Sequence, residues 1–145
     1  MILYRLIYCS YASPKLGYDD LKDIMEKSQK NNSVDGITGQ LCYGDSMFLQ
    51  ILEGDRKSVS KTYHRITLDD RHHSSELIEC SPIESRQFAV WSMRAVKLGD
   101  LEGGKVKNLI LKYSGSTTFQ PNYMTPNQCI GFMQELLAQS SMATS

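Results

Sequence analysis

Runs of β-branched, aliphatic and aromatic residues divide the first hundred residues into strands. Polar residues, with glycine and proline among them, separate one run from the next. The second and third runs lie close enough together to form a hairpin, with its turn at Gly44 and Asp45. The runs that we expect to form strands are residues 2–9, 36–43, 46–53, 76–83 and 91–98.

Hydrophobic residues spaced three and four apart predict helices between these strands. The first helix begins after Gly17, and its inward face ends at Asn32. The second helix follows Asp55, a favourable N-cap residue, and runs to about residue 70. Two more helices are expected in the tail. The one over residues 101–113 contains two consecutive glycines and should be short or frayed, whereas a stronger one starts from the capping sequence at Thr125.

The order of these elements predicts an α+β fold of the ferredoxin-like type. Strand, helix, strand, strand, helix, strand is the split βαβ arrangement, and the run at residues 91–98 adds a fifth strand. Right-handed crossovers place both helices on one face of a mixed sheet. The opposite face then needs a cover, which the two tail helices can supply. We therefore expect a core over residues 1–98 and a helical extension over residues 99–145 that packs on the same domain.

Composition and charge limit the classes of function. The chain has 145 residues with 16 basic and 16 acidic side chains, so it lacks the basic footprint of a nucleic-acid-binding protein. It contains no apolar stretch near the roughly 20 residues that a membrane span requires. Arg5 interrupts the apolar start that a signal peptide would need. We expect a cytoplasmic protein that binds neither nucleic acid nor membrane.

Two polar side chains fall on inward positions of strands in the middle of the predicted sheet. Tyr8 shares a strand face with Leu6, and Gln50 shares one with Phe48. An unsatisfied buried hydroxyl or amide costs about 1–3 kcal/mol, so a direct Tyr8–Gln50 hydrogen bond is the economical arrangement. That bond can be a private core contact that only sets the strand register. It can also belong to a binding site, because part of the Gln50 amide stays free for a third group.

Asn32 favours the binding site. It ends the inward face of the first helix, where its amide can hydrogen-bond the edge of a heteroaromatic ring. The alternative is that Asn32 is the C-cap of that helix. A planar ligand with imide-like donors and acceptors would satisfy Tyr8, Gln50 and Asn32 together. The apolar walls of such a pocket are expected to be Ile24, Ile37, Leu41, Phe48 and Ile66.

Charged residues gather near the end of the second helix. Arg65 and a histidine can hold a phosphate through charge-assisted hydrogen bonds, and the alternative is an exposed helix end whose cations complement the helix dipole. His64, His72 and His73 lack carboxylates or thiols at metal-ligand spacing, so we expect no metal site.

Five blocks of sequence carry a further signal when they are taken together: RLIYCS at residues 5–10, Asn32 followed by GITGQLCY at 36–43, FLQILEG at 48–54, DDRHH at 69–73 and FAVWSM at 88–93. These blocks resemble the core of a BLUF domain, a family of blue-light receptors. A further segment, residues 111–121, is similar to the short single-domain PixD type of that family, so the likeness covers nearly the whole chain.

The resemblance implies a bound flavin between the two helices, usually FAD with FMN also accommodated. Tyr8 would donate an electron and a proton to the photoexcited ring, Gln50 would bridge Tyr8 to the N5/O4 edge, and Asn32 would bind the O4/N3 side. The residues expected to act in the photochemistry are Tyr8, Ser28, Asn32, Gln50, Trp91 and Met93. The residues expected to contact the flavin are Tyr8, Ile24, Ser28, Asn31, Asn32, Ile37, Leu41, Phe48, Gln50, Arg65, Ile66, Asp69 and His72. Among these, the ones expected to hold the polar ring edge, the ribityl chain or a phosphate are Asn31, Arg65, Asp69 and His72.

The resemblance also implies a function without substrate turnover. Light would rearrange the hydrogen bonds of Gln50 and give a red-shifted state that controls a protein partner. The implied partners are further copies of the chain, in a dimer or a ring-like oligomer, and a response-regulator-type protein in phototaxis signalling. Two alternatives stay open: a ferredoxin-like binding module without photochemistry, and a flavin-dependent enzyme. Against the enzyme, the sequence has neither a dinucleotide-binding glycine fingerprint nor a Ser–His–Asp set.

Overall fold

Within residues 1–89 and 93–144, which the computed structural model describes, five strands and four α-helices follow one another in the predicted order. The strands are β1 (Leu3–Ala12), β2 (Thr38–Gly44), β3 (Met47–Asp55), β4 (His72–Pro82) and β5 (Arg94–Lys97). The helices are α1 (Tyr18–Asp35), α2 (Arg56–Thr67), α3 (Gly103–Ser114) and α4 (Pro126–Thr144), with short 3-10 turns at Leu98–Asp100 and Pro121–Tyr123.

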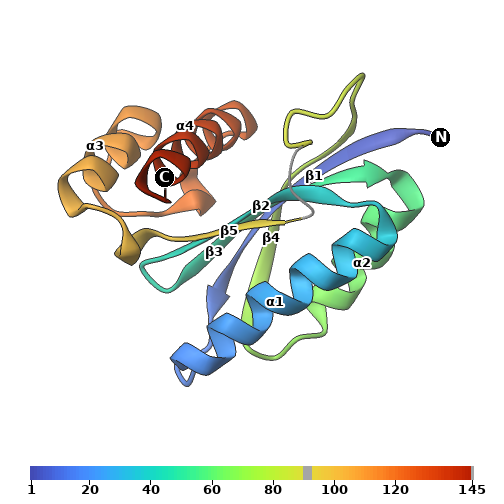
Figure 1. Ribbon diagram of the computed structural model, residues 1–145, viewed down its shortest axis with the longest axis horizontal. Coiled ribbons are helices and arrows are strands. Elements are labelled where there is room, and N and C mark those ends of the chain that lie inside the picture. Colours follow the sequence, from blue (N-terminus) through green and yellow to red (C-terminus); the bar gives the residue numbers. More distant parts are fainter. Residues whose placement is uncertain (90–92, 145) are drawn as a thin grey trace.

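The strands form one mixed sheet in the order β4-β1-β3-β2-β5. β3 lies antiparallel between β1 and β2, β4 is antiparallel to β1 at one edge, and β5 is parallel to β2 at the other. Figure 1 shows α1 and α2 on one side of this sheet and α3 and α4 on the other. The predicted ferredoxin-like α+β fold, with its fifth strand and its second helical layer, is confirmed.

Alternate residues of the central strands point into two separate apolar cores. On the α1–α2 side, Leu6 and Leu52 are buried with residues of both helices. On the opposite side, Ile7 and Ile51 are buried with tail residues such as Phe132 of α4. Because successive side chains of a strand point to opposite faces, the same two strands supply both cores.

The β2–β3 turn differs from the prediction. Asp45 and Ser46 are its central residues, with φ angles of 48° and 61°, whereas Gly44 and Asp45 were expected. Two consecutive positive φ angles match the twist of an antiparallel hairpin. Gly44 ends β2, where a Cβ atom would lie 2.5 Å from Leu98 Cδ1, so glycine is needed there for close packing.

The second helix and the fourth strand also have different limits. α2 ends at Thr67, before the predicted residue 70, and the Thr67 hydroxyl donates to the His64 carbonyl at 2.9 Å. β4 begins at His72 because His72 already pairs with Ala12 of β1, four residues before the apolar run starts. Backbone pairing along an edge strand does not require apolar side chains, and therefore the hydrophobic pattern missed this extension.

The prediction of a short or frayed first tail helix is wrong. α3 is regular from Gly103 to Ser114, and the two glycines occupy its first two positions. The first N–H groups of a helix have no intrahelical partner, so glycine costs less there than in a helix interior. The start of α4 agrees with its capping sequence. Thr125 and Gln128 exchange hydrogen bonds between their side chains and backbone N–H groups at 3.2 and 2.9 Å.

Candidate functional site

A cavity of about 380 Å³ lies between α1, α2 and the sheet face that these helices cover. Its volume falls within the range of roughly 300–1,000 Å³ that small-molecule sites occupy. The lining residues are Tyr8, Ile24, Lys27, Ser28, Asn31, Asn32, Leu41, Phe48, Gln50, Thr62, Arg65, Ile66, Leu68, Asp69, Arg71 and His72.

The lining contains all the residues expected to contact a flavin except Ile37. Ile37 is buried in the apolar core beside the cavity and packs against the backbone of β3, where a Cβ on Gly54 would lie 2.7 Å from Ile37 Cδ1. It is therefore a core residue and not a cavity wall. The lining residues that the pattern did not single out for the site are Lys27, Thr62, Leu68 and Arg71.

Tyr8 and Gln50 lie at the floor of the cavity on neighbouring strands. They are directly opposed in the β1–β3 register, and the Tyr8 hydroxyl donates a hydrogen bond to Gln50 Oε1. Both side chains are buried. Burial raises the pKa of Tyr8 far above its ordinary value, with smaller contributions from Tyr63 and Asp69. The hydroxyl, which is protonated at neutral pH even at the ordinary tyrosine pKa of about 10, is available as a donor.

The second end of the Gln50 amide points to Met93. Gln50 Nε2 lies 3.5 Å from Met93 Sδ, a weak acceptor. Met93 is 1% exposed, and its carbonyl accepts a hydrogen bond of 3.2 Å from Gln29 of α1. The residue preceding β5 therefore contacts both the site and α1. Trp91, the other expected photochemical residue near this strand, lies outside the described residues.

Asn32 lies inside α1, one turn before its end, and is not the C-cap. The C-cap is Gly36, with a left-handed φ of 68°, and its N–H bonds the Asn32 carbonyl. The Asn32 side chain is 2% exposed, and its Nδ2 atom has no hydrogen-bond partner among the described residues. The hydroxyl of Thr62 on α2 also has no hydrogen-bond partner among the described residues. An unpaired buried polar group costs about 1–3 kcal/mol. A ligand that hydrogen-bonds these two groups would therefore stabilise the protein.

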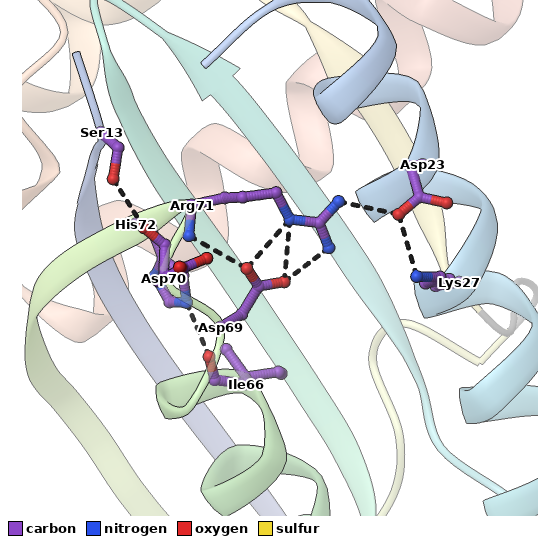
Figure 2. A network of polar contacts seen from close by, with 8 residues as sticks. All are labelled: Ser13, Asp23, Lys27, Ile66, Asp69, Asp70, Arg71 and His72. Carbon is purple, nitrogen blue, oxygen red and sulfur yellow. Dashed lines mark hydrogen bonds and ion pairs between the residues drawn. The ribbon is translucent and has the colours of Figure 1, made fainter. Parts of the chain in front are cut away.

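A cluster of charged residues, shown in Figure 2, includes Asp69 and Arg71 of the cavity lining. The Arg71 guanidinium binds both oxygens of Asp69, with Nε at 2.9 Å from Oδ1 and Nη2 at 2.6 Å from Oδ2. Its Nη1 atom reaches across to Asp23 of α1 at 2.7 Å. These bonds to Arg71 hold the pKa of both carboxyl groups below the ordinary value. Arg71 thus ties the segment after α2 to the first half of α1.

His72 follows this cluster with both ring nitrogens engaged. Nε2 lies 2.7 Å from the Ile66 carbonyl and Nδ1 lies 2.8 Å from the Ser10 hydroxyl. A carbonyl can only accept, so Nε2 carries the proton, and Nδ1 of the neutral ring accepts from Ser10. Because both nitrogens have protein partners, His72 contributes a fixed wall to the cavity in this structure. Arg65, in contrast, is 40% exposed, and its guanidinium forms a 3.6 Å ion pair with Asp35.

Among residues 1–89 and 93–144, no group of three or more histidine, cysteine or acidic side chains is arranged to hold a metal ion. None of the described helices is both long and apolar enough to cross a bilayer.

Comparison with protein families shows which family the chain belongs to. The family model described as "BLUF: Sensors of blue-light using FAD" matches residues 3–94. The chain belongs to the BLUF family. It is a blue-light-sensing flavoprotein, and the matched residues include every cavity-lining residue.

Relatives of this BLUF protein include large and small proteins. The photoactivated adenylate cyclase subunit beta of Euglena gracilis is 32% identical over 92 residues, which are 63% of this chain and 11% of the relative. The chain thus spans about a tenth of the length of such cyclase relatives. The structure of BlsA in its photo-activated state gives a TM-score of 0.83 at 30% identity, with 94% of this chain and 95% of BlsA covered. BlrB, a BLUF protein in its dark state, gives 0.76 at 27% identity, with 96% and 97% covered.

Proposed function

We propose that this BLUF protein is a light-driven switch in which Tyr8 is the donor and Gln50 is the group that rearranges. The observation that carries the proposal is the buried Tyr8–Gln50 hydrogen bond at the floor of a cavity that is also lined by Asn32, whose Nδ2 atom has no partner among the described residues. A bond that served only to set the strand register would need neither the cavity nor an unsatisfied amide beside it.

The residues of the cavity fit FAD or FMN. Ile24 and Ile66 offer apolar walls from the two helices, and Asn32 Nδ2 can donate to a ring carbonyl. Lys27 and Arg65 are exposed cations on the lining, suited to a phosphate. The remaining polar contacts of the proposal are Ser28, Asn31 and Asp69, and His72 contributes a wall of the cavity.

A bound flavin would supply blue-light absorption and an excited state able to accept an electron and a proton transiently from a nearby donor, to which both would return. Tyr8 holds that proton in the dark and directs it toward Gln50. Gln50 presents its carbonyl to Tyr8 and its NH2 group toward Met93. Rotation or tautomerisation of the amide inverts donor and acceptor on both sides at once, and the changed hydrogen bonds produce the red-shifted state.

We propose that the signal is transmitted through Met93, the residue immediately before β5. A change in the Gln50–Met93 contact would shift β5 between two positions, and a protein partner would bind one of them better. No substrate is turned over. A dimer or ring of several copies and a response-regulator-type partner in phototaxis belong to this proposal. Exposed apolar side chains on the tail, such as Leu111 and Tyr123, support a partner surface.

The absorption spectrum of the purified protein tests the proposal. We expect a flavin band that shifts to the red in blue light and returns in the dark, and chromatography of the released cofactor distinguishes FAD from FMN. A colourless protein that takes up neither flavin would favour a binding module of another kind. Continuous oxidation of an added reductant in the dark would favour an enzyme.

A further inference from the structure

Thr62 is a buried polar side chain of the cavity lining that the proposed photochemistry leaves unused. It is 1% exposed and lines the cavity. A threonine inside a helix can bond the carbonyl four residues earlier, yet the Thr62 hydroxyl has no partner among the described residues. The side chain lies on the inward stripe of α2 with Val59 and Ile66, so the hydroxyl is presented toward the space under the helix.

Ion pairs place Thr62 and Asn32 at the same end of the cavity. Asp35, at the end of α1, lies 3.8 Å from Lys61 and 3.6 Å from Arg65 of α2. Asn32 is one turn before Asp35, and Thr62 is next to Lys61. The Arg71–Asp23 bond joins the segment after α2 to the first half of α1, so α1 and α2 run in opposite directions along the cavity.

The two unpartnered groups define a chemical preference. The Asn32 Nδ2 atom can only donate, and the Thr62 hydroxyl can donate and accept. A ligand that satisfies both must present at least one acceptor, with a second acceptor or a donor beside it. The pyrimidine half of the flavin ring carries carbonyl groups next to an imide N–H and provides this pattern, whereas the dimethylbenzene half provides neither.

We infer that the Thr62 hydroxyl hydrogen-bonds the pyrimidine edge of the bound flavin, which makes Thr62 a further residue that positions the ring. This inference rests on the proposed function, because it requires a flavin in the cavity. It goes beyond that function in assigning a ligand contact to α2 through a residue outside the set expected from the family resemblance.

Thr62→Val tests the inference, since valine has the shape of threonine without the hydroxyl. Binding of riboflavin, FMN and FAD to the apoprotein should weaken by the same factor, about 3- to 10-fold, because the lost contact is to the ring that all three share. The infrared carbonyl bands of the bound ring should move to higher frequency. The apoprotein itself should be as stable as wild type or more stable in urea, because an unpaired buried hydroxyl has been removed.

Thr62→Ser retains the hydroxyl and should bind flavin as wild type does. The matched control is Thr67→Val on the same helix. The Thr67 hydroxyl already bonds the His64 carbonyl and does not line the cavity, so flavin affinity should not change.

The possible results separate this inference from the proposed function. If wild type binds all three flavins and Thr62→Val binds them equally well, the inference is wrong and the function stands. A loss confined to FMN and FAD would place the hydroxyl at the phosphate and would also overturn the inference. If wild type binds no flavin, both fail together.

Discussion

Tyr8 and Gln50 face each other across the antiparallel strands β1 and β3, and the Tyr8 hydroxyl donates to Gln50 Oε1. The same register places Gln50 opposite Leu41 of β2, so the amide lies in the middle of the sheet with a neighbour on each side. The geometry of the Tyr8 hydroxyl and of the Gln50 amide is therefore set by the pairing of central strands. Small changes in the surrounding loops should leave it intact.

Tyr8→Phe should retain flavin binding and lose the red-shifted state, because the donor hydroxyl is gone. Gln50 Oε1 would then lack its partner, so the apoprotein should lose about 1–3 kcal/mol of stability. Flavin spectra before and after blue light, together with urea unfolding of the apoprotein, measure the two effects. Tyr63→Phe is the control, because the Tyr63 ring packs on Tyr8 with centroids 5.3 Å apart but does not bond Gln50. A normal photocycle in Tyr8→Phe would refute the donor role.

Gln50→Leu should abolish the spectral shift while the flavin stays bound, because leucine keeps the volume and removes the amide. Gln40→Leu is the matched control. Gln40 is equally buried on β2, but its Nε2 atom contacts Met133 of α4 on the opposite face of the sheet at 3.6 Å. Light-minus-dark difference spectra compare the two variants. If both lose the shift, the effect comes from damage to the sheet and not from the amide beside the cavity.

Met93→Leu should leave flavin binding and stability nearly unchanged, since the two side chains have similar volumes and such exchanges usually cost less than about 1.5 kcal/mol. The NH2 group of Gln50 loses its sulfur contact, which removes a stabilising feature of the dark state. The red-shifted state should consequently decay more slowly, and its decay after a light pulse measures this. Met133→Leu on α4 makes the equivalent change on the other face of the sheet. The red-shifted state of this variant should decay at the wild-type rate.

Arg65→Ala should weaken the binding of FMN and FAD and leave riboflavin binding unchanged, because only the first two carry phosphate. Lys61→Ala is the control, since Lys61 also lies within 4 Å of Asp35 but does not line the cavity. Dissociation constants from fluorescence titration of the apoprotein supply the comparison. An equal loss for riboflavin would mean that Arg65 supports the ring or the fold, and not the phosphate.

The Arg71 cluster should make stability depend on pH at the acidic end. The pKa of Asp69 is lowered in the folded state, chiefly by the hydrogen bond from Arg71. Its contribution is complete above the unfolded pKa of about 3.9 and is lost as the pH falls through the lower folded value. Asp69→Asn should be less stable than wild type at pH 7, and the difference should shrink below about pH 4. Unfolding of the apoprotein across pH gives this difference.

Asp70→Asn is the matched control for that experiment. The backbone carbonyl of Asp70, and not its carboxylate, accepts the bond from Ser13, as Figure 2 shows. Its substitution should therefore leave the stability difference between pH 7 and about pH 3 close to that of wild type. If the Asp69→Asn difference persists undiminished at pH 3, then the Asp69 carboxylate is not the source of the effect.

The hydrophobic pattern predicted the fold because the periodicity of each strand and helix can be recognised within a few consecutive residues. Alternation along β1 and β3 placed Tyr8 and Gln50 on inward positions, and strand order placed those strands side by side. The stripe on α1 placed Asn32 on the cavity face, although its local sequence also permitted a helix C-cap. The site residues that were missed have a common property. Thr62 belongs to an apolar helix stripe and Arg71 to a charged segment, and neither pattern reveals a cavity.

By itself, the sequence determined which faces of its strands and helices turn inward, and its blocks identified the family. Only the tertiary structure decided which inward polar atoms are left without partners. Asn32 Nδ2 and Thr62 Oγ1 have no partner among the described residues because both side chains line the cavity between α1, α2 and the sheet, whereas Gln50 is paired because two strands meet in register. Arg71 bonds Asp23, which is 48 residues away in the sequence, because the segment after α2 packs beside α1. Hydrogen bonding depends on atoms lying within about 3 Å of each other, and that proximity arises only when separately encoded elements pack together.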